Sequence, residues 1–150
     1  MKMTPSKINT FNMFKLPAAF FTGVRVKSIT KDTCVVNVKH KWVNQNPFKS
    51  MFWAVQGMAA ELSTGALIMA ALHQSGIKAS MLLIENKATF AKKAVGKIIF
   101  SCTQEKQINE VIAKTRMNGP QQIWLYAAGV DAAGDEVSSF AFLWSIKAKN

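Results

Sequence analysis

The sequence predicts one α+β domain in which a curved antiparallel sheet wraps around a long central helix. The stretch 48–72 is apolar on nearly every side. Short segments in which apolar and polar residues alternate, the pattern of strands, lie on both sides of it. A helix on the surface of a sheet needs only one apolar stripe, so this one must be covered on several faces. A strongly curved sheet would supply that cover.

Composition supports a folded single domain, expected to span residues 1–150. Hydrophobic residues make up 49% of the 150-residue chain and charged residues 18%, which favours a packed core over disorder. The net charge of +11 favours an anionic partner, and nucleic acid, an anionic membrane and a phosphorylated ligand all remain open. Cys34 and Cys102 are too few for a disulfide framework and form no zinc motif. We expect two reduced thiols in a cytoplasmic protein.

The first 22 residues predict an N-terminal helical segment. They begin like a signal peptide, but Lys15 and Pro17 interrupt the apolar stretch that such a peptide needs. Thr4 is a good helix cap, and Pro5 fits a first helical turn. The apolar positions recur at helical spacing: Ile8, Phe11 and Phe14.

Two strands are predicted before the central helix. Val24 and Val26 alternate with basic residues in the first strand. One face of the second strand is predicted to carry Cys34, Val36, Val38, His40 and Trp42. Asn46-Pro47 then signals a turn, and the central helix is expected over 48–75, ending at Gly76.

The remainder predicts four strands and one surface helix. Strands are expected over 78–93 and 96–102, around a turn at 94–96. A helix over 105–119 has the apolar stripe Ile108, Val111 and Ile112. The segments 121–130 and 136–147 predict a closing hairpin.

A membrane span is the alternative for the central helix, because Met51–Leu72 has about the required length. Glu61 near its middle argues against this, since a central acid costs on the order of 3 kcal/mol on insertion. The flanking strands would also lose their core. We therefore expect no membrane span.

Glu61 is the candidate functional residue. Gly57 and Gly65 lie one turn on either side of it, and Thr64 shares its helix face. Such spacing could form a small polar pocket inside an apolar helix. The alternative is that the glycines only permit tight packing and that Glu61 pairs with a lysine. The residues themselves leave both readings open.

The segment from Asn46 to Glu61 resembles the start of the central helix in hotdog-fold thioesterases of the phenylacetyl-CoA type. That family has an Asn-rich loop, then His-Gly-Gly, then an Asp or Glu two to three turns later. Asn46 and Glu61 match the loop and the acid. Phe52, Trp53 and Ala54 stand where the family has His-Gly-Gly. The chain is most similar to a branch of hotdog proteins, known as a domain of unknown function, in which this motif is also degraded.

The resemblance implies an acyl-CoA thioesterase with a hotdog fold. Glu61 would be the general base or nucleophile, and Asn46 would position the thioester or the water. Backbone amides at the helix start would polarise the thioester carbonyl. The implied binding residues are Phe52, Trp53, Ala54, Gly57, Thr64, Gly65, Lys92, Lys93 and Lys97. The three lysines would contact the phosphates of coenzyme A, or would form an ordinary solvated cluster.

The resemblance also implies a homodimer or tetramer, with the site near the subunit boundary. Coenzyme A would enter only as part of the substrate, with no other cofactor. No metal is expected, because no group of His, Cys or acids has ligand spacing. No nucleic-acid motif accompanies the positive charge. A non-catalytic acyl-CoA or lipid binder remains the alternative, favoured by the bulk of Phe52 and Trp53.

Overall fold

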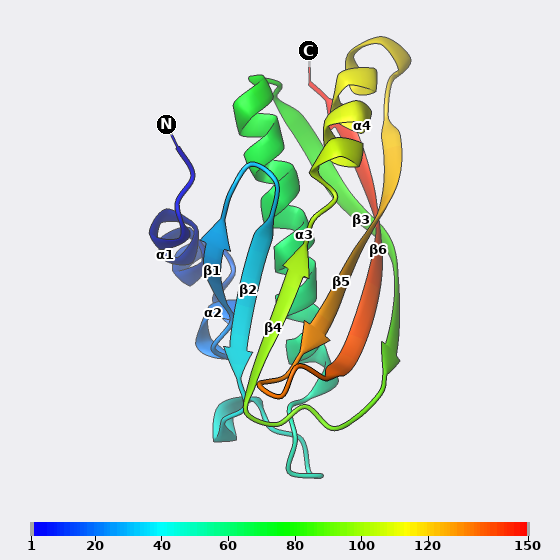
Figure 1. The fold of residues 1–150 in the computed structure, drawn as a ribbon. Helices are drawn as coiled ribbons and strands as arrows, with labels where there is room; N and C mark the ends of the chain where they lie inside the picture. The colour runs from blue at the N-terminus through cyan, green and yellow to red at the C-terminus, as the bar shows by residue number, and fades with distance from the viewer. Residues whose placement is uncertain (1, 150) are drawn as a thin grey trace.

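A computed structural model describes residues 2–149 and confirms the curved antiparallel sheet around a central helix (Figure 1). The helix is α3 (Trp53–Ser75). Across the sheet the strand order is β1 (Arg25–Ile29), β2 (Cys34–Lys39), β4 (Lys97–Cys102), β5 (Gln121–Val130), β6 (Glu136–Ala148) and β3 (Ala79–Phe90). Every neighbouring pair is antiparallel.

Helix α3 is buried on several faces, as its composition predicts. Its buried residues include Val55, Ala59, Leu67 and Ile68. By length and composition it could cross a membrane, but 72% of its most apolar window is buried inside the domain, as in a core helix. It ends at Gly76, whose φ of 68° is the left-handed conformation that glycine favours at a helix end.

The central helix begins at Trp53 rather than at residue 48, because the preceding residues form a tight turn. Asn46 Oδ1 accepts hydrogen bonds from the backbone N–H of Phe48 (2.9 Å) and Ser50 (3.2 Å). Lys49 has a φ of 60°, and Met51 forms a β-bridge with Gln45. These hydrogen bonds satisfy the backbone groups of residues 46–51 in a turn. The helix therefore starts later than the apolar pattern of the sequence does.

Strand β2 shows the predicted alternation over part of its expected length. Cys34, Val36 and Val38 are buried against the core. The strand ends at Lys39, however, so His40 and Trp42 lie outside it. Trp42 belongs to a short 3-10 helix (Trp42–Asn44), and its side chain is 83% exposed. The prediction that His40 and Trp42 belong to one face of this strand is therefore wrong.

The two cysteines lie opposite one another in the β2–β4 ladder. Cys34 pairs with Cys102 in register, and both thiols are free and buried. Burial raises the pKa of the Cys34 thiol to about 12, and the neighbouring Cys102 adds to the shift. Neither thiol is therefore reactive in the folded protein.

Strands β3 and β4 do not form a hairpin around residues 94–96. Instead β3 pairs with β6, and β4 lies between β2 and β5. The predicted hairpin of β5 and β6 is confirmed. Strand β3 is thus an edge strand, and most of its side chains are exposed.

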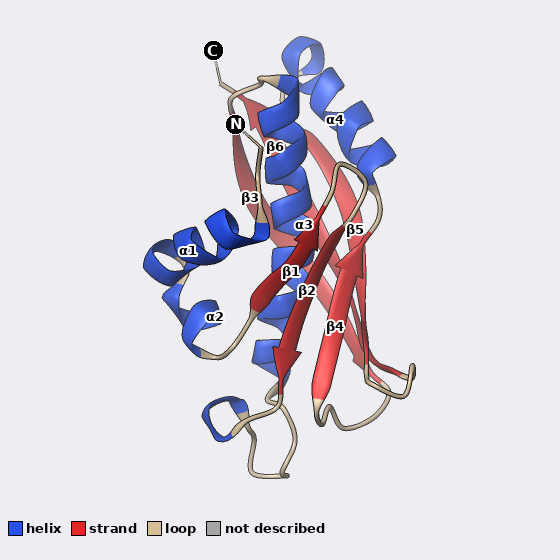
Figure 2. Cartoon of the chain, turned by 60° about the vertical axis from the view of Figure 1, so that its left-hand side comes forward, coloured by secondary structure: helices blue, strands red, loops and turns tan. Residues whose placement is uncertain are grey.

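The opposite edge of the sheet is covered by the N-terminal helices, α1 (Pro5–Lys15) and α2 (Pro17–Phe21), which lie beside β1 (Figure 2). Thr4 caps α1 as predicted, accepting from Lys7 N at 3.4 Å. The Asn9 amide exchanges two 2.9 Å hydrogen bonds with the backbone of Val26, as a neighbouring strand would. Of the predicted apolar stripe of this helix, Ile8 is buried, whereas Phe11 and Phe14 are exposed.

Helix α4 (Glu105–Asn118) packs its predicted apolar stripe on the sheet. Ile108 and Ile112 are fully buried, and Val111 packs at the margin of the core. The helix contacts α3 as well as β5 and β6. It therefore covers one end of the central helix.

Candidate functional site

Glu61 lies midway along α3, on the side facing strand β6. A β-carbon on Gly65 would lie 3.7 Å from Glu61 Oε1 and 3.4 Å from the ring of Trp144. Both groups would meet such a β-carbon at ordinary contact distance, so Trp144 and the Glu61 carboxylate close around the glycine. Burial raises the pKa of the Glu61 carboxyl, because water no longer fully solvates its charge.

The Glu61 carboxylate has no protein partner among residues 2–149. No lysine or arginine of the described chain forms a salt bridge with it, and no side chain donates a hydrogen bond to it. The alternative in which Glu61 pairs with a lysine therefore finds no support. A half-buried acid without a structural partner is a candidate for chemistry.

Thr64 contributes to this region through the backbone. Its hydroxyl donates to the carbonyl of Glu61 at 2.8 Å and accepts from Trp144 Nε1 at 3.0 Å. The threonine thus joins the middle of α3 to β6. Its hydroxyl fixes the backbone that carries Glu61.

The two glycines serve different contacts. A β-carbon on Gly57 would lie 3.4 Å from the ring of Phe140 and would not approach the carboxylate. Gly57 therefore allows close packing of α3 on β6. Gly65 packs on Trp144 and also lies beside the Glu61 carboxylate, so of the two glycines only Gly65 adjoins the candidate acid.

The start of α3 presents two backbone amides without internal partners. The N–H of Phe52 donates to the carbonyl of Asn44 at 2.9 Å and is not available to a ligand. The N–H groups of Trp53 and Ala54 belong to the first turn, where a helix leaves its donors unpaired. The rings of Phe52 and Trp53 make an edge contact at 6.0 Å and are about half exposed.

These amides are distant from Glu61 within one chain. Eight residues separate Trp53 from Glu61, which corresponds to roughly 12 Å along a helix. A carbonyl held by the amides is therefore out of reach of the carboxylate of the same protomer.

Asn46 is engaged in the turn that precedes α3. In addition to its two backbone contacts, its amide group bonds to the hydroxyl of Ser50 at 3.0 Å. Asn46 is therefore a structural residue of the turn in this state. It lines a pocket of about 330 Å³ together with Trp53, Lys92 and Lys93.

Gln56 lies in the wall of the same pocket and was not singled out by the sequence analysis. Its side chain is 4% exposed, and Nε2 donates to the carbonyl of Met51 at 3.3 Å. Its Oε1 is buried without a donor from the described residues. An amide in an apolar helix is the only sequence signal for this residue.

The three candidate lysines have different surroundings. Lys92 lies between Asp131 (2.7 Å) and Asp135 (3.0 Å), so its charge is already balanced. Its hydrogen bond lowers the pKa of Asp131 and, reciprocally, the carboxylate raises the pKa of Lys92. Lys93 donates to the carbonyl of Phe48 at 3.3 Å and is exposed. Lys97 begins β4, opposite Lys39.

A family model described as Domain of unknown function (DUF4442) matches residues 7–146. The chain belongs to this family. The match covers the sheet, the central helix and Glu61. DUF4442 membership agrees with the expected resemblance to a hotdog branch with a degraded motif. A search of curated proteins finds no match.

Solved structures share the fold of this DUF4442 chain at low sequence identity. A Pseudomonas aeruginosa protein described as a probable thioesterase has a TM-score of 0.84 at 18% identity, covering 99% of each chain. A Chlorobaculum tepidum protein of unknown function gives the same values. A Haemophilus influenzae thioesterase has a TM-score of 0.76 at 11% identity, covering 99% of this chain and 93% of its own. The expected hotdog fold is confirmed.

Proposed function

We propose that the protein is a cytoplasmic acyl-CoA thioesterase that uses Glu61 to hydrolyse the thioester. The observation that carries the proposal is the carboxylate itself. It is half-buried, has no protein partner among the described residues, and lies beside Gly65. The thioesterases of the same fold support the reaction class.

The proposed reaction is addition of water to the thioester carbonyl. The Glu61 carboxylate takes a proton from water while the water oxygen bonds to the carbonyl carbon. The resulting oxyanion accepts hydrogen bonds from the helix-start amides of Trp53 and Ala54. Collapse of this intermediate breaks the carbon–sulfur bond and releases the thiol and the acid. Direct attack by Glu61 on the carbonyl, followed by hydrolysis of the anhydride, is the second route.

We propose that two protomers complete the site. The roughly 12 Å between Glu61 and the helix-start amides requires that these groups come from different copies. The edge of β3 is the surface through which a second copy would pair, because the β1 edge is already occupied by Asn9. Asn46 then helps to position the thioester or water only if its turn rearranges.

The test is thiol release from short, long and aryl acyl-CoA substrates. We expect Glu61→Gln to lower turnover at least ~100-fold, the usual scale for a positioned acid or base, while substrate binding is retained. Glu110→Gln, which changes an exposed acid on α4, is the matched control and should keep full activity. Unchanged turnover in Glu61→Gln would contradict the assigned role.

A non-catalytic acyl-CoA or lipid binder is the second candidate. The observation that favours it is the position of the Phe52 and Trp53 rings at the helix start, beside the amides that would hold the oxyanion. Wild-type protein that binds these substrates but releases no thiol from any of them would establish this alternative.

A further inference from the structure

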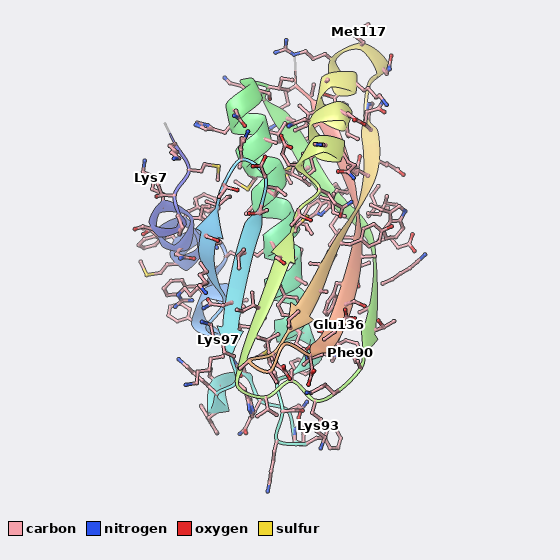
Figure 3. All side chains as sticks on the ribbon, viewed as in Figure 1. Lys7, Phe90, Lys93, Lys97, Met117 and Glu136 are labelled. Atoms are coloured by element: carbon pink, nitrogen blue, oxygen red, sulfur yellow. The ribbon has the colours of Figure 1, made fainter. Side chains whose placement is uncertain are left out.

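One end of the molecule combines exposed aromatic side chains with lysines. The exposed apolar residues are Trp42, Val43 and Phe48, with exposures from 51% to 83%. The lysines exposed at this end are Lys39, Lys41, Lys49, Lys93 and Lys97. We call this surface the aromatic end. Figure 3 shows Lys93 and Lys97 projecting at this end of the ribbon.

Backbone and side-chain contacts join these residues into one surface. The Phe52 N–H donates to the carbonyl of Asn44, whose own N–H donates to Lys41. Lys93 Nζ reaches the carbonyl of Phe48 at 3.3 Å. The segments before α3 and before β4 therefore lie together, although they are about fifty residues apart in sequence.

The turn that carries Phe48 is held in place before any partner binds. Asn46 Oδ1 bonds to the backbone of both Phe48 and Ser50. Lys49, at the apex, adopts a φ of 60°, which a non-glycine residue rarely does. The turn thus presents an aromatic ring and an ammonium group in a fixed arrangement, which reduces the ordering cost of binding.

The positive charge at this end limits the kinds of partner that it can bind. The carboxylates nearby belong to the β5–β6 turn, and two of them, Asp131 and Asp135, already hold Lys92. Of the remaining lysines, Lys41 and Lys49 are next to Trp42 and Phe48 in the sequence, and Lys93 contacts the Phe48 carbonyl. A second copy of the chain would place lysines against lysines, so this surface does not suit self-association. An anionic surface that also accepts apolar side chains would bind both the lysines and the exposed aromatic rings.

We infer that the aromatic end docks on the surface of a membrane containing anionic lipids. Tryptophan and phenylalanine rings insert at the headgroup boundary, while lysine ammonium groups stay at lipid headgroups. The aromatic rings project from protruding turns, whereas single-stranded nucleic acid is bound along a groove. This docking is peripheral and leaves α3 in the core. It does not depend on the chemistry of Glu61.

Vesicle co-sedimentation tests the inference with full-length protein. We expect binding to vesicles of phosphatidylcholine mixed with phosphatidylserine, and little binding to phosphatidylcholine alone. The variant Trp42→Ser/Phe48→Ser keeps the charge and should bind the mixed vesicles at least ~10-fold more weakly. Replacing Lys41 and Lys49 by Gln should weaken binding by about fivefold per lysine, or about 25-fold for both.

The matched control is Phe11→Ser/Phe14→Ser. These rings are 52% and 70% exposed on α1, away from the aromatic end, and their loss should leave binding unchanged. Thermal unfolding of each variant verifies that it is folded. The inference is wrong if wild-type protein ignores the mixed vesicles, or if the control loses as much binding as Trp42→Ser/Phe48→Ser does.

Competition with a single-stranded oligonucleotide tests nucleic acid as the alternative partner. If the oligonucleotide displaces wild-type protein from the mixed vesicles, and Trp42→Ser/Phe48→Ser weakens oligonucleotide binding, nucleic acid is the occupant and the inference is overturned. Glu61→Gln should bind vesicles as wild type does even if the proposed hydrolysis is wrong, so the two proposals fail separately.

Discussion

Glu61 couples the candidate site to the stability of the fold. Burial raises the pKa of its carboxyl above the usual value of 4.5, so the neutral form is favoured in the folded protein. The stability that this provides is complete below the unfolded-state pKa and is lost as the pH rises through the raised folded-state pKa. Ionised Glu61 therefore destabilises the fold at neutral and alkaline pH.

We expect Glu61→Gln to unfold at a higher urea concentration than wild type at pH 8. The difference should shrink as the pH is lowered toward 4.5, because wild-type Glu61 then becomes neutral as well. Urea unfolding across this pH range measures the effect, with Glu110→Gln as an exposed control that lacks it. A difference that is the same at every pH would show that ionisation of Glu61 is not its cause.

Individual residues of the site were only partly predictable from the sequence. Glu61 is identified by its position in an apolar helix, and the structure shows that it lacks a partner among residues 2–149. The surroundings of Lys92 depend on Asp131 and Asp135, about forty residues away, and no local pattern indicates that contact. The same applies to Gln56, whose unpaired oxygen becomes evident only when the packing around it is known.

At the scale of elements, two glycines differ in how closely neighbouring side chains pack against them. A β-carbon on Gly129 of β5 would lie 2.5 Å from the buried ring of Phe100, too close for any real contact. On Gly57 of α3 it would meet Phe140 at 3.4 Å, a distance that requires only a small adjustment. One position requires glycine, while the other tolerates alanine.

We therefore expect Gly129→Ala to lower the free energy of unfolding by about 1–3 kcal/mol, the usual cost of overpacking a core. Gly57→Ala should change it by less than about 1 kcal/mol in either direction, because the helix propensity gained offsets the tighter contact. Urea unfolding of both variants checks this. Equal losses would mean that the Phe100 ring moves aside without cost.

Local signals predicted the elements that depend on local contacts. The Thr4 cap, the Gly76 helix end and the β5–β6 hairpin are all confirmed. The strand neighbours of β3 and β4 depend on contacts with distant segments, and the sequence offers no local signal for them. The sequence pattern placed the start of α3 too early, at residue 48. The reason is that an apolar residue such as Met51 is buried in the turn, just as it would be in a helix.

At the scale of the whole molecule, the two edges of the sheet differ. One edge is covered by α1, while β3 carries the exposed apolar residues Leu82 (65%) and Ile84 (46%). An open edge strand is a template for pairing with another chain. This asymmetry supports the proposed dimer through β3.

We expect light scattering to give at least twice the chain mass of 16.6 kDa. The substitution Leu82→Lys/Ile84→Lys should shift the protein toward monomer, since charges on an edge strand oppose pairing. Met117→Lys changes a residue that is 88% exposed on α4 and should not alter the mass. A wild-type monomer at micromolar concentration would contradict the proposal and with it the shared site.

The position of β3 in the sheet has a consequence for synthesis on the ribosome. Its strand partner within the chain is β6, and Ala79 pairs with Ala148. The nascent chain therefore completes α3 and β3 well before β6 exists to pair with them. During that interval the apolar helix lacks part of its cover, and the newly made segment is a natural client for a chaperone that shields hydrophobic surface.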